Sequence, residues 1–257
     1  MGFFDDTDGL VGAAKVAAGW GILAFDTAAL GLAVIAVSAL PGGMRPAYEI
    51  GRFWAMANLW TLGADLHILG REHVVPGQAY VLMVNHQSHL DTGAVVAALP
   101  MHLAYVMKQE LRKIPIFGYG CERMGMVYVE RGNRESARRS MAEAARRVAA
   151  GRSVVFYPEG TRSRDGRLGE FKTGGFRLAI EAQVPILPVS ISGTRAMFPP
   201  DSWRFRAGRI DIVIGDPIST TGLKQEDVPS LLARTRAAIL SGLPREAAGA
   251  EGASERG

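Results

Sequence analysis

A histidine and an aspartate lie five residues apart, directly after a short apolar run, in the segment Asn85-His86-Gln87-Ser88-His89-Leu90-Asp91. The run Tyr80–Val84 predicts a strand, and ligand sites of α/β sheets usually form beyond the carboxyl ends of strands. A carboxylate bonded to one imidazole nitrogen fixes the tautomer and stabilises the imidazolium, which leaves the other nitrogen free to take a proton. His86 and Asp91 are therefore candidates for a general base and its partner.

The same segment also has a purely structural explanation. Ser88-x-x-Asp91 resembles a capping box, and an acidic residue is favoured in the first turn of a helix. His89 fits a solvent-facing helical position equally well. The structural and the catalytic roles of Asp91 do not exclude each other.

A second cluster follows the predicted strand Val154–Tyr157, in the stretch Pro158-Glu159-Gly160-Thr161-Arg162-Ser163 and then Lys172-Thr173-Gly174-Gly175 before a helix. Small residues let backbone N–H groups approach an anion, and a helix start adds a positive dipole end. Arg162 and Lys172 supply formal charge. The loop lacks Gly-Lys-Ser/Thr and is therefore no nucleotide P-loop. It is a candidate site for a different anion.

Further candidates are weaker on sequence grounds. Lys108 closes one predicted strand, and Arg131 follows another; arginine suits bidentate phosphate binding, but a surface cation explains each of them as well. The single cysteine, Cys121, has no base near it in sequence and fits a small packed thiol. The five histidines show no metal-ligand spacing, so we predict no metal site.

The elements that must position these residues alternate between strands and helices. We predict strands at Asp65–Leu69, Tyr80–Val84, Leu103–Met107, Met126–Val129, Val154–Tyr157, Ile186–Ile191 and Arg209–Ile214, with helices at about 89–98, 134–150, 174–182 and 225–241. This alternation predicts an α/β fold with a mixed, largely parallel sheet flanked by helices.

The first 62 residues differ from the rest. Between Lys15 and Arg45 the only charged residue is Asp26, and the apolar run Thr27–Leu40 is shorter than the roughly 20 residues that a span needs. Extending the run backward places Asp26 mid-span, at a cost of about 2.5 to 3.5 kcal/mol. A Pro-Gly-Gly break precedes a second helical stretch, Ala47–Leu62, with the aromatic residues Tyr48, Phe53, Trp54 and Trp60. We predict a two-helix hairpin that dips into one leaflet; a full span and a buried pair of core helices are the alternatives.

Length, composition and charge agree with this division. The chain has 257 residues, 48% of them hydrophobic, and a net charge of +4 whose basic excess lies in the body of the chain. We predict a membrane-associated hairpin at 1–62, a catalytic domain at 63–244 and a disordered tail at 245–257. The arginine-rich helix 134–150 fits a solvated face or a contact with anionic headgroups. Nucleic acid is not an expected partner, because no known binding module accompanies the arginines.

Taken together, the motifs resemble the glycerolipid acyltransferase family defined by a His-x4-Asp motif, and within it the bacterial 1-acylglycerol-3-phosphate acyltransferases most closely. The resemblance covers about residues 50–195 and rests on four ordered blocks: Asn85–Asp91; Gly125–Gly132, preceded by the segment from Lys108 to Gly118; Tyr157–Ser163; and Val184–Val189. Tyr157 departs from the pattern, because phenylalanine is usual there.

The resemblance implies that His86 is the general base and Asp91 its partner. It implies a substrate-binding role for Lys108, Arg131, Glu159, Gly160, Thr161, Arg162 and Lys172. It further implies an enzyme at the cytoplasmic face of the cell membrane, monotopic or with a single span. Its acyl donor would be acyl-CoA or acyl carrier protein, with no metal or other cofactor.

The main hypothesis is acylation of lysophosphatidic acid to phosphatidic acid. The same chemistry on a lyso-ornithine lipid, glycerol 3-phosphate or another lysophospholipid is an alternative. A non-catalytic peripheral membrane module is a second alternative, from a different functional class.

Overall fold

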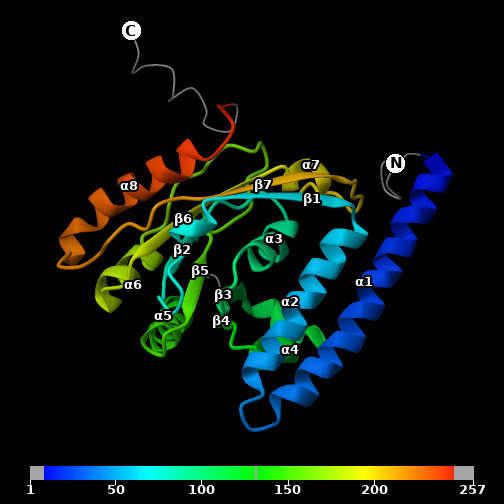
Figure 1. Ribbon diagram of the computed structural model, residues 1–257, viewed down its shortest axis with the longest axis horizontal. Helices are drawn as coiled ribbons and strands as arrows, with labels where there is room; N and C mark the ends of the chain where they lie inside the picture. The colour runs from blue at the N-terminus through cyan, green and yellow to red at the C-terminus, as the bar shows by residue number, and fades with distance from the viewer. Residues whose placement is uncertain (1–8, 131, 246–257) are drawn as a thin grey trace.

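The computed structural model describes residues 9–130 and 132–245, and Figure 1 shows a twisted sheet with helices on both of its faces. Its seven strands lie in the order β1-β7-β6-β2-β5-β3-β4. Their bounds are β1 Ala64–Leu69, β2 Val81–Val84, β3 Leu103–Lys108, β4 Val127–Val129, β5 Ser153–Phe156, β6 Ile186–Ser192 and β7 Gly208–Ile214. Arg131 and the predicted tail beyond Arg245 lie outside the described residues.

The predicted mixed, largely parallel sheet is confirmed. Every neighbouring pair of strands is parallel except β6 and β7, which run antiparallel. The strands β6, β2, β5, β3 and β4 therefore end at one common edge. In a parallel sheet this carboxyl edge is where a site can form from several strands at once.

The helices are α1 Gly9–Ser38, α2 Met44–Thr61, α3 Leu90–Ala98, α4 Phe117–Arg123, α5 Arg134–Ala149, α6 Gly174–Ala182, α7 Thr194–Met197 and α8 Val228–Ser241, with short 3-10 turns η1 Arg71–His73, η2 Gln109–Lys113 and η3 Gln225–Asp227. Helices α5, α6 and α8 cover one face of the sheet, and α3 with α2 covers the other (Figure 1). The segment from Gln109 to Gly118 contains η2 and the start of α4.

Strand β2 shows why its sequence belongs in the middle of this sheet. Leu82 and Val84 belong to the core cluster that contains α3, whereas Val81 and Met83 belong to the one that contains α6 and α8. All four side chains are buried, as expected for a central parallel strand with both faces covered. The candidate catalytic residues come directly after β2, and they therefore leave the sheet from a fully buried central strand.

Helices α1 and α2 form an antiparallel hairpin beside the sheet (Figure 1). In the described part of the chain, one segment, Val11–Ser38, is long and apolar enough to cross a membrane. Almost none of it is buried within the chain, so α1 is no core helix. Its 28 residues measure about 42 Å, longer than the roughly 30 Å of a hydrocarbon core.

The hairpin contacts the rest of the protein in the first half of α1 and at the end of this helix. In the first half, the indole N–H of Trp20 donates to the carbonyl of Trp203 over 2.9 Å. At its end, the Arg123 guanidinium donates to the hydroxyl and the carbonyl of Ser38 over 2.9 and 2.6 Å. Helix α1 thus lies along the body of the protein rather than extending away from it.

The aromatic residues of α2 divide between two environments. Tyr48 is buried, and its hydroxyl donates to the Met101 carbonyl and accepts from the Leu103 amide. Trp60 is 83% exposed and Phe53 is 61% exposed. Phe53 and Trp60 are therefore available for a membrane–water interface. The partly buried Trp54 donates to the Thr27 hydroxyl on α1, and the inner side of α2 packs against α3.

Candidate active site

The candidate site lies at the carboxyl edge of the sheet, where β2 ends. Asn85 fastens this end to β6, because its side-chain amide donates to the Ile191 carbonyl over 2.9 Å and accepts from the Ile191 amide over 2.7 Å. These two bonds fix the position of the backbone just beyond the end of β2. His86 is the next residue.

The His86 Nδ1 atom lies 2.7 Å from Oδ2 of Asp91, which belongs to the first turn of α3 and is fully buried. Because the carboxylate only accepts, the proton of a neutral His86 sits on Nδ1 and the lone pair on Nε2. The His86 side chain is 17% exposed. Within the described residues nothing hydrogen bonds Nε2, so this nitrogen can accept a proton from a substrate.

Asp91 is held by donors on both of its oxygens. Oδ2 also accepts from the amides of Gln87 and Ser88 over 2.6 and 2.8 Å, and Oδ1 accepts from the Thr194 hydroxyl over 2.6 Å. Four donors around one carboxylate fix its orientation. Asp91 thus caps the start of α3 and orients His86 at once.

Thr194 was not predicted from the sequence. It is fully buried at the start of α7, beyond the carboxyl end of β6, and it is separated from Asp91 by 103 residues. No local pattern joins the two; only the parallel neighbourhood of β2 and β6 brings them together.

Tyr157 supports the imidazole from the side. Its ring stacks on His86 with centroids 3.9 Å apart and an angle of 15° between the planes. Its hydroxyl lies 3.1 Å from the Thr92 hydroxyl on α3, and burial raises the pKa of Tyr157 well above its usual value. The phenol therefore stays neutral, and its ring restricts the rotation of the candidate base.

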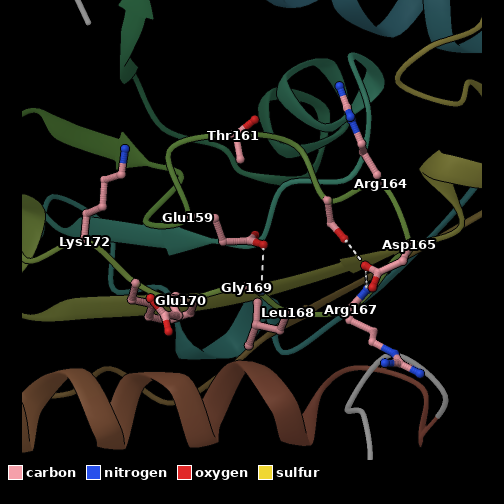
Figure 2. A pocket seen from close by; sticks show the side chains of 11 residues that line it. Glu159, Thr161, Arg164, Asp165, Arg167, Leu168, Gly169, Glu170 and Lys172 are labelled. Carbon is pink, nitrogen blue, oxygen red and sulfur yellow. Dashed lines mark hydrogen bonds between the residues drawn. The ribbon is translucent and has the colours of Figure 1, made fainter. Parts of the chain in front are cut away.

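Glu159 joins the two loops of the site. One of its oxygens accepts from the backbone amide of His86 over 2.8 Å, and the other accepts from the Gly169 amide over 2.9 Å (dashed in Figure 2). In the reverse direction the Ser163 amide donates to the His86 carbonyl over 2.7 Å. Burial raises the pKa of Glu159, while the two amide donors oppose this shift. Both oxygens of Glu159 are therefore bound to backbone amides of the protein.

The loop after β5 encloses a cavity of about 580 Å³. Figure 2 shows Thr161, Arg164 and Lys172 pointing to one side of this loop and Arg167 to the other. Gly160 has a φ of +71°, and a β-carbon there would meet the Lys172 ammonium at 2.5 Å. The positive φ favours glycine at this turn, and the absence of a side chain lets the lysine lie close over it.

Arg162 and Lys108 lie at the same edge of the sheet with different surroundings. Arg162 is half-buried, and its Nη1 contacts Nε2 of His89 and the Pro200 carbonyl, the latter over 3.4 Å. Lys108 ends β3; its ammonium is 47% exposed and lies 3.2 Å from the Glu110 carboxylate. Arg131 follows β4 but falls outside the described residues.

Cys121 is a buried thiol on α4, as expected for a packed residue. Burial raises its pKa to about 12, which leaves almost no thiolate at neutral pH. In the part of the chain that the structure describes, no three metal-binding side chains gather. The histidine at the end of β2 is therefore the group in this region with the geometry of a base.

Comparisons with known proteins agree with this site. Residues 65–192 match a family model described as "Acyltransferase". The chain is 33% identical over 213 residues to the "1-acyl-sn-glycerol-3-phosphate acyltransferase alpha" of Ovis aries, and 32% identical over 213 residues to the protein of that name from Homo sapiens. Each alignment covers 82% of this chain, with 74% and 75% of the relative.

A solved structure has the same fold. The 1-acyl-sn-glycerophosphate (LPA) acyltransferase PlsC from Thermotoga maritima superimposes with a TM-score of 0.74 at 25% sequence identity. The match covers 85% of this chain and 92% of that chain. The similarity therefore includes most of the architecture described above.

Proposed function

Since the chain belongs to the 1-acyl-sn-glycerol-3-phosphate acyltransferase family, we propose that the His86–Asp91 pair carries out its acyl transfer. The reaction moves a fatty acyl group to the free hydroxyl of lysophosphatidic acid and gives phosphatidic acid. The observation that carries the proposed mechanism is the 2.7 Å contact between His86 Nδ1 and a fully buried carboxylate, with Nε2 left open.

In this mechanism Nε2 of His86 takes the proton of the acceptor hydroxyl as the oxygen attacks the thioester carbonyl. The tetrahedral intermediate collapses, the carbon–sulfur bond breaks, and the departing thiolate receives the proton back from the imidazolium. Asp91 stabilises that imidazolium. Proton transfer by the general base contributes about 10²–10⁴-fold. A thioester is already activated, so the reaction needs no nucleophile from the protein.

The acceptor phosphate would bind to the cations of the loop after β5. Arg162 and Lys172 carry the charge, with Lys108 at the end of β3 and Arg131 as further candidates. Gly160 and Thr161 shape the loop, and Glu159 fixes its distance from His86. Binding the phosphate there would position the free hydroxyl against Nε2 of His86. This positioning lowers the entropic cost of bringing the reacting groups together.

The acyl donor in this proposal is acyl-CoA or acyl carrier protein, and no metal or other cofactor takes part. Residues 1–62 would form the membrane-associated part and residues 63–244 the catalytic domain. The contacts that Trp20 and Ser38 of α1 make with the body favour a hairpin lying in one leaflet. In this proposal the leaflet is at the cytoplasmic face of the cell membrane. Such a hairpin would let lysophosphatidic acid reach His86 without leaving the bilayer.

An acceptor panel with a labelled acyl donor tests the proposal. We expect transfer to lysophosphatidic acid and much weaker transfer to lyso-ornithine lipid, glycerol 3-phosphate and phosphate-free lysolipids. Running the panel with acyl-CoA and with acyl carrier protein in parallel identifies the donor. Equal transfer to phosphate-free acceptors would contradict the role of the loop cations.

Extraction of the membrane-bound protein tests the role of the hairpin. The side chains of Phe25 and Trp60 are 73% and 83% exposed, so attachment should depend on apolar burial. We expect the protein to stay with the membrane in 1 M salt, where the Debye length is about 3 Å, and to be released by detergent. Complete release by salt would mean that the basic body, not the hairpin, attaches the protein.

A further inference from the structure

His89 contacts the guanidinium that the proposed function assigns to the acceptor phosphate. Its Nε2 accepts a hydrogen bond from Nη1 of Arg162. We propose that His89 is a positioning residue, which holds Arg162 in the orientation that receives the phosphate of lysophosphatidic acid. The inference rests on the proposed phosphate-binding role of Arg162.

Two acceptors fix one nitrogen of Arg162. Nη1 carries two hydrogens; the first is directed at His89 and the second at the Pro200 carbonyl over 3.4 Å. Within the described residues no acceptor hydrogen bonds Nη2 or Nε. The N–H groups of these two atoms form the planar fork that binds a phosphate in a bidentate manner. The protein therefore holds Arg162 through Nη1 and leaves Nη2 and Nε to bind the phosphate.

The position of His89 is itself defined. It immediately precedes α3, and its ring packs against Phe198 with centroids 5.5 Å apart at an angle of 37°. His86 lies three residues earlier on the same loop. One short segment thus carries both the proposed base and the group that orients the phosphate ligand.

The contact requires a neutral imidazole. An arginine side chain can only donate, so Nε2 of His89 must hold a lone pair and Nδ1 the proton. Burial, Arg162 and His86 lower the pKa of His89, and Asp91 opposes them. The acceptor form therefore persists at neutral pH. A protonated His89 would lose the hydrogen bond and repel Arg162.

A double-mutant cycle tests the inference. We expect His89→Leu to raise the KM for lysophosphatidic acid about tenfold, the usual range for a hydrogen bond to a charged group, with kcat changed less than about twofold. His89→Gln retains an acceptor and should stay within about threefold of the wild-type KM. In an Arg162→Ala background, His89→Leu should add no further increase. His67→Leu, on the opposite edge strand β1, is the matched control.

The pH dependence provides an independent readout. Protonation of His89 should raise the wild-type KM as the pH falls below 6.5, the ordinary histidine value, towards the lowered pKa of this residue. The acceptor phosphate titrates near pH 6 as well, but it does so equally in both enzymes. The ratio of the wild-type KM to the His89→Gln KM isolates the histidine and should rise in acid.

Each result separates the inference from the proposed function. An unchanged KM in His89→Leu, or the same increase with and without Arg162, would overturn the positioning role while leaving the phosphate role intact. An unchanged KM in Arg162→Ala would overturn both. A ratio that does not vary with pH would also contradict the contact. A cooperative thermal transition in each variant shows that the measured protein is folded.

Discussion

The two halves of the candidate site are built in opposite ways. The half that holds His86 is buried: Asp91 is fully enclosed by four donors, and Tyr157 stacks on the imidazole. The half that holds the cations is open, with Lys108 and Thr161 exposed and Arg162 partly so. The first half can fix a reacting atom in place, and the second can admit an anionic headgroup from outside.

This difference predicts which kinetic constant each half controls. A preorganised base and its orienting carboxylate act on the transition state, so their loss should lower kcat. Exposed cations that bind the phosphate act on ground and transition state alike, so their loss should raise KM. Variants in each half therefore test whether kcat and KM are controlled separately in this way.

The largest effect is expected for Asp91→Asn. The amide nitrogen would face donors from Gln87, Ser88 or Thr194, and the tautomer of His86 would no longer be fixed. We expect kcat to fall by about 10²–10⁴-fold, at most as much as on loss of His86 itself, with KM for lysophosphatidic acid within a few-fold of wild type. Steady-state kinetics on the purified protein in detergent measures both constants. A kcat within tenfold of wild type would show that the carboxylate does not orient the base.

The next effect is expected for Arg162→Ala. Removing a charged donor pair costs about 1.5 to 3 kcal/mol, equivalent to a rise in KM of roughly 10- to 100-fold, while kcat should change little. The same substitution at Arg138, an exposed partner of Glu135 on α5, is the matched control and should leave both constants unchanged. A loss of kcat without a change in KM would place Arg162 on the catalytic side of the division.

Thr194→Val should have a smaller effect on kcat, because it removes one of the four donors of Asp91 and leaves the other three. We expect kcat to fall about tenfold and the free energy of unfolding to fall by about 1 to 3 kcal/mol, since a buried acceptor loses its partner. Thr194→Ser keeps the hydroxyl and should restore kcat. Denaturant unfolding and kinetics on the two variants check this. Equal kcat in the valine and serine variants would mean that the hydroxyl is not needed for orientation.

The smallest effect is expected for Tyr157→Phe, which keeps the ring on His86 and removes only the contact with Thr92. We expect kcat within about threefold of wild type and a loss of stability of about 0.5 to 1.5 kcal/mol. Tyr157→Leu removes the stack as well and should lower kcat by a further fivefold or so. If the leucine variant matched the phenylalanine variant in kcat, the stack would have no part in holding the base.

Much of the fold was predictable, because its signals are local. Seven short β-branched runs gave strand bounds within one residue of those observed, and the order of the blocks led to the acyltransferase family. The partnership of His86 and Asp91 was also accessible, since both residues lie on one loop and its following helix. The division of the α2 aromatics was not, because composition alone does not show that Tyr48 faces Met101 and α3.

The parts of the site that could not be predicted all depend on contacts between distant segments. Thr194 reaches Asp91 only because β6 lies beside β2, and the Glu159 carboxylate is engaged because the loop after β5 folds back to Gly169. His89 looked like a solvent-facing residue until the fold placed Arg162 against it. Motif spacing identifies which residues belong to the site; it does not show which of them face the substrate and which face each other.

The most direct test of the central claim is a measurement of His86→Ala alongside wild type, with turnover and lysophosphatidic acid binding recorded on the same membrane-bound sample. We expect turnover to fall by about 10²–10⁴-fold while binding and membrane attachment stay unchanged. Near-wild-type turnover would contradict the role of His86 as the base. Loss of binding together with turnover would contradict the division of the site into a catalytic half and a binding half.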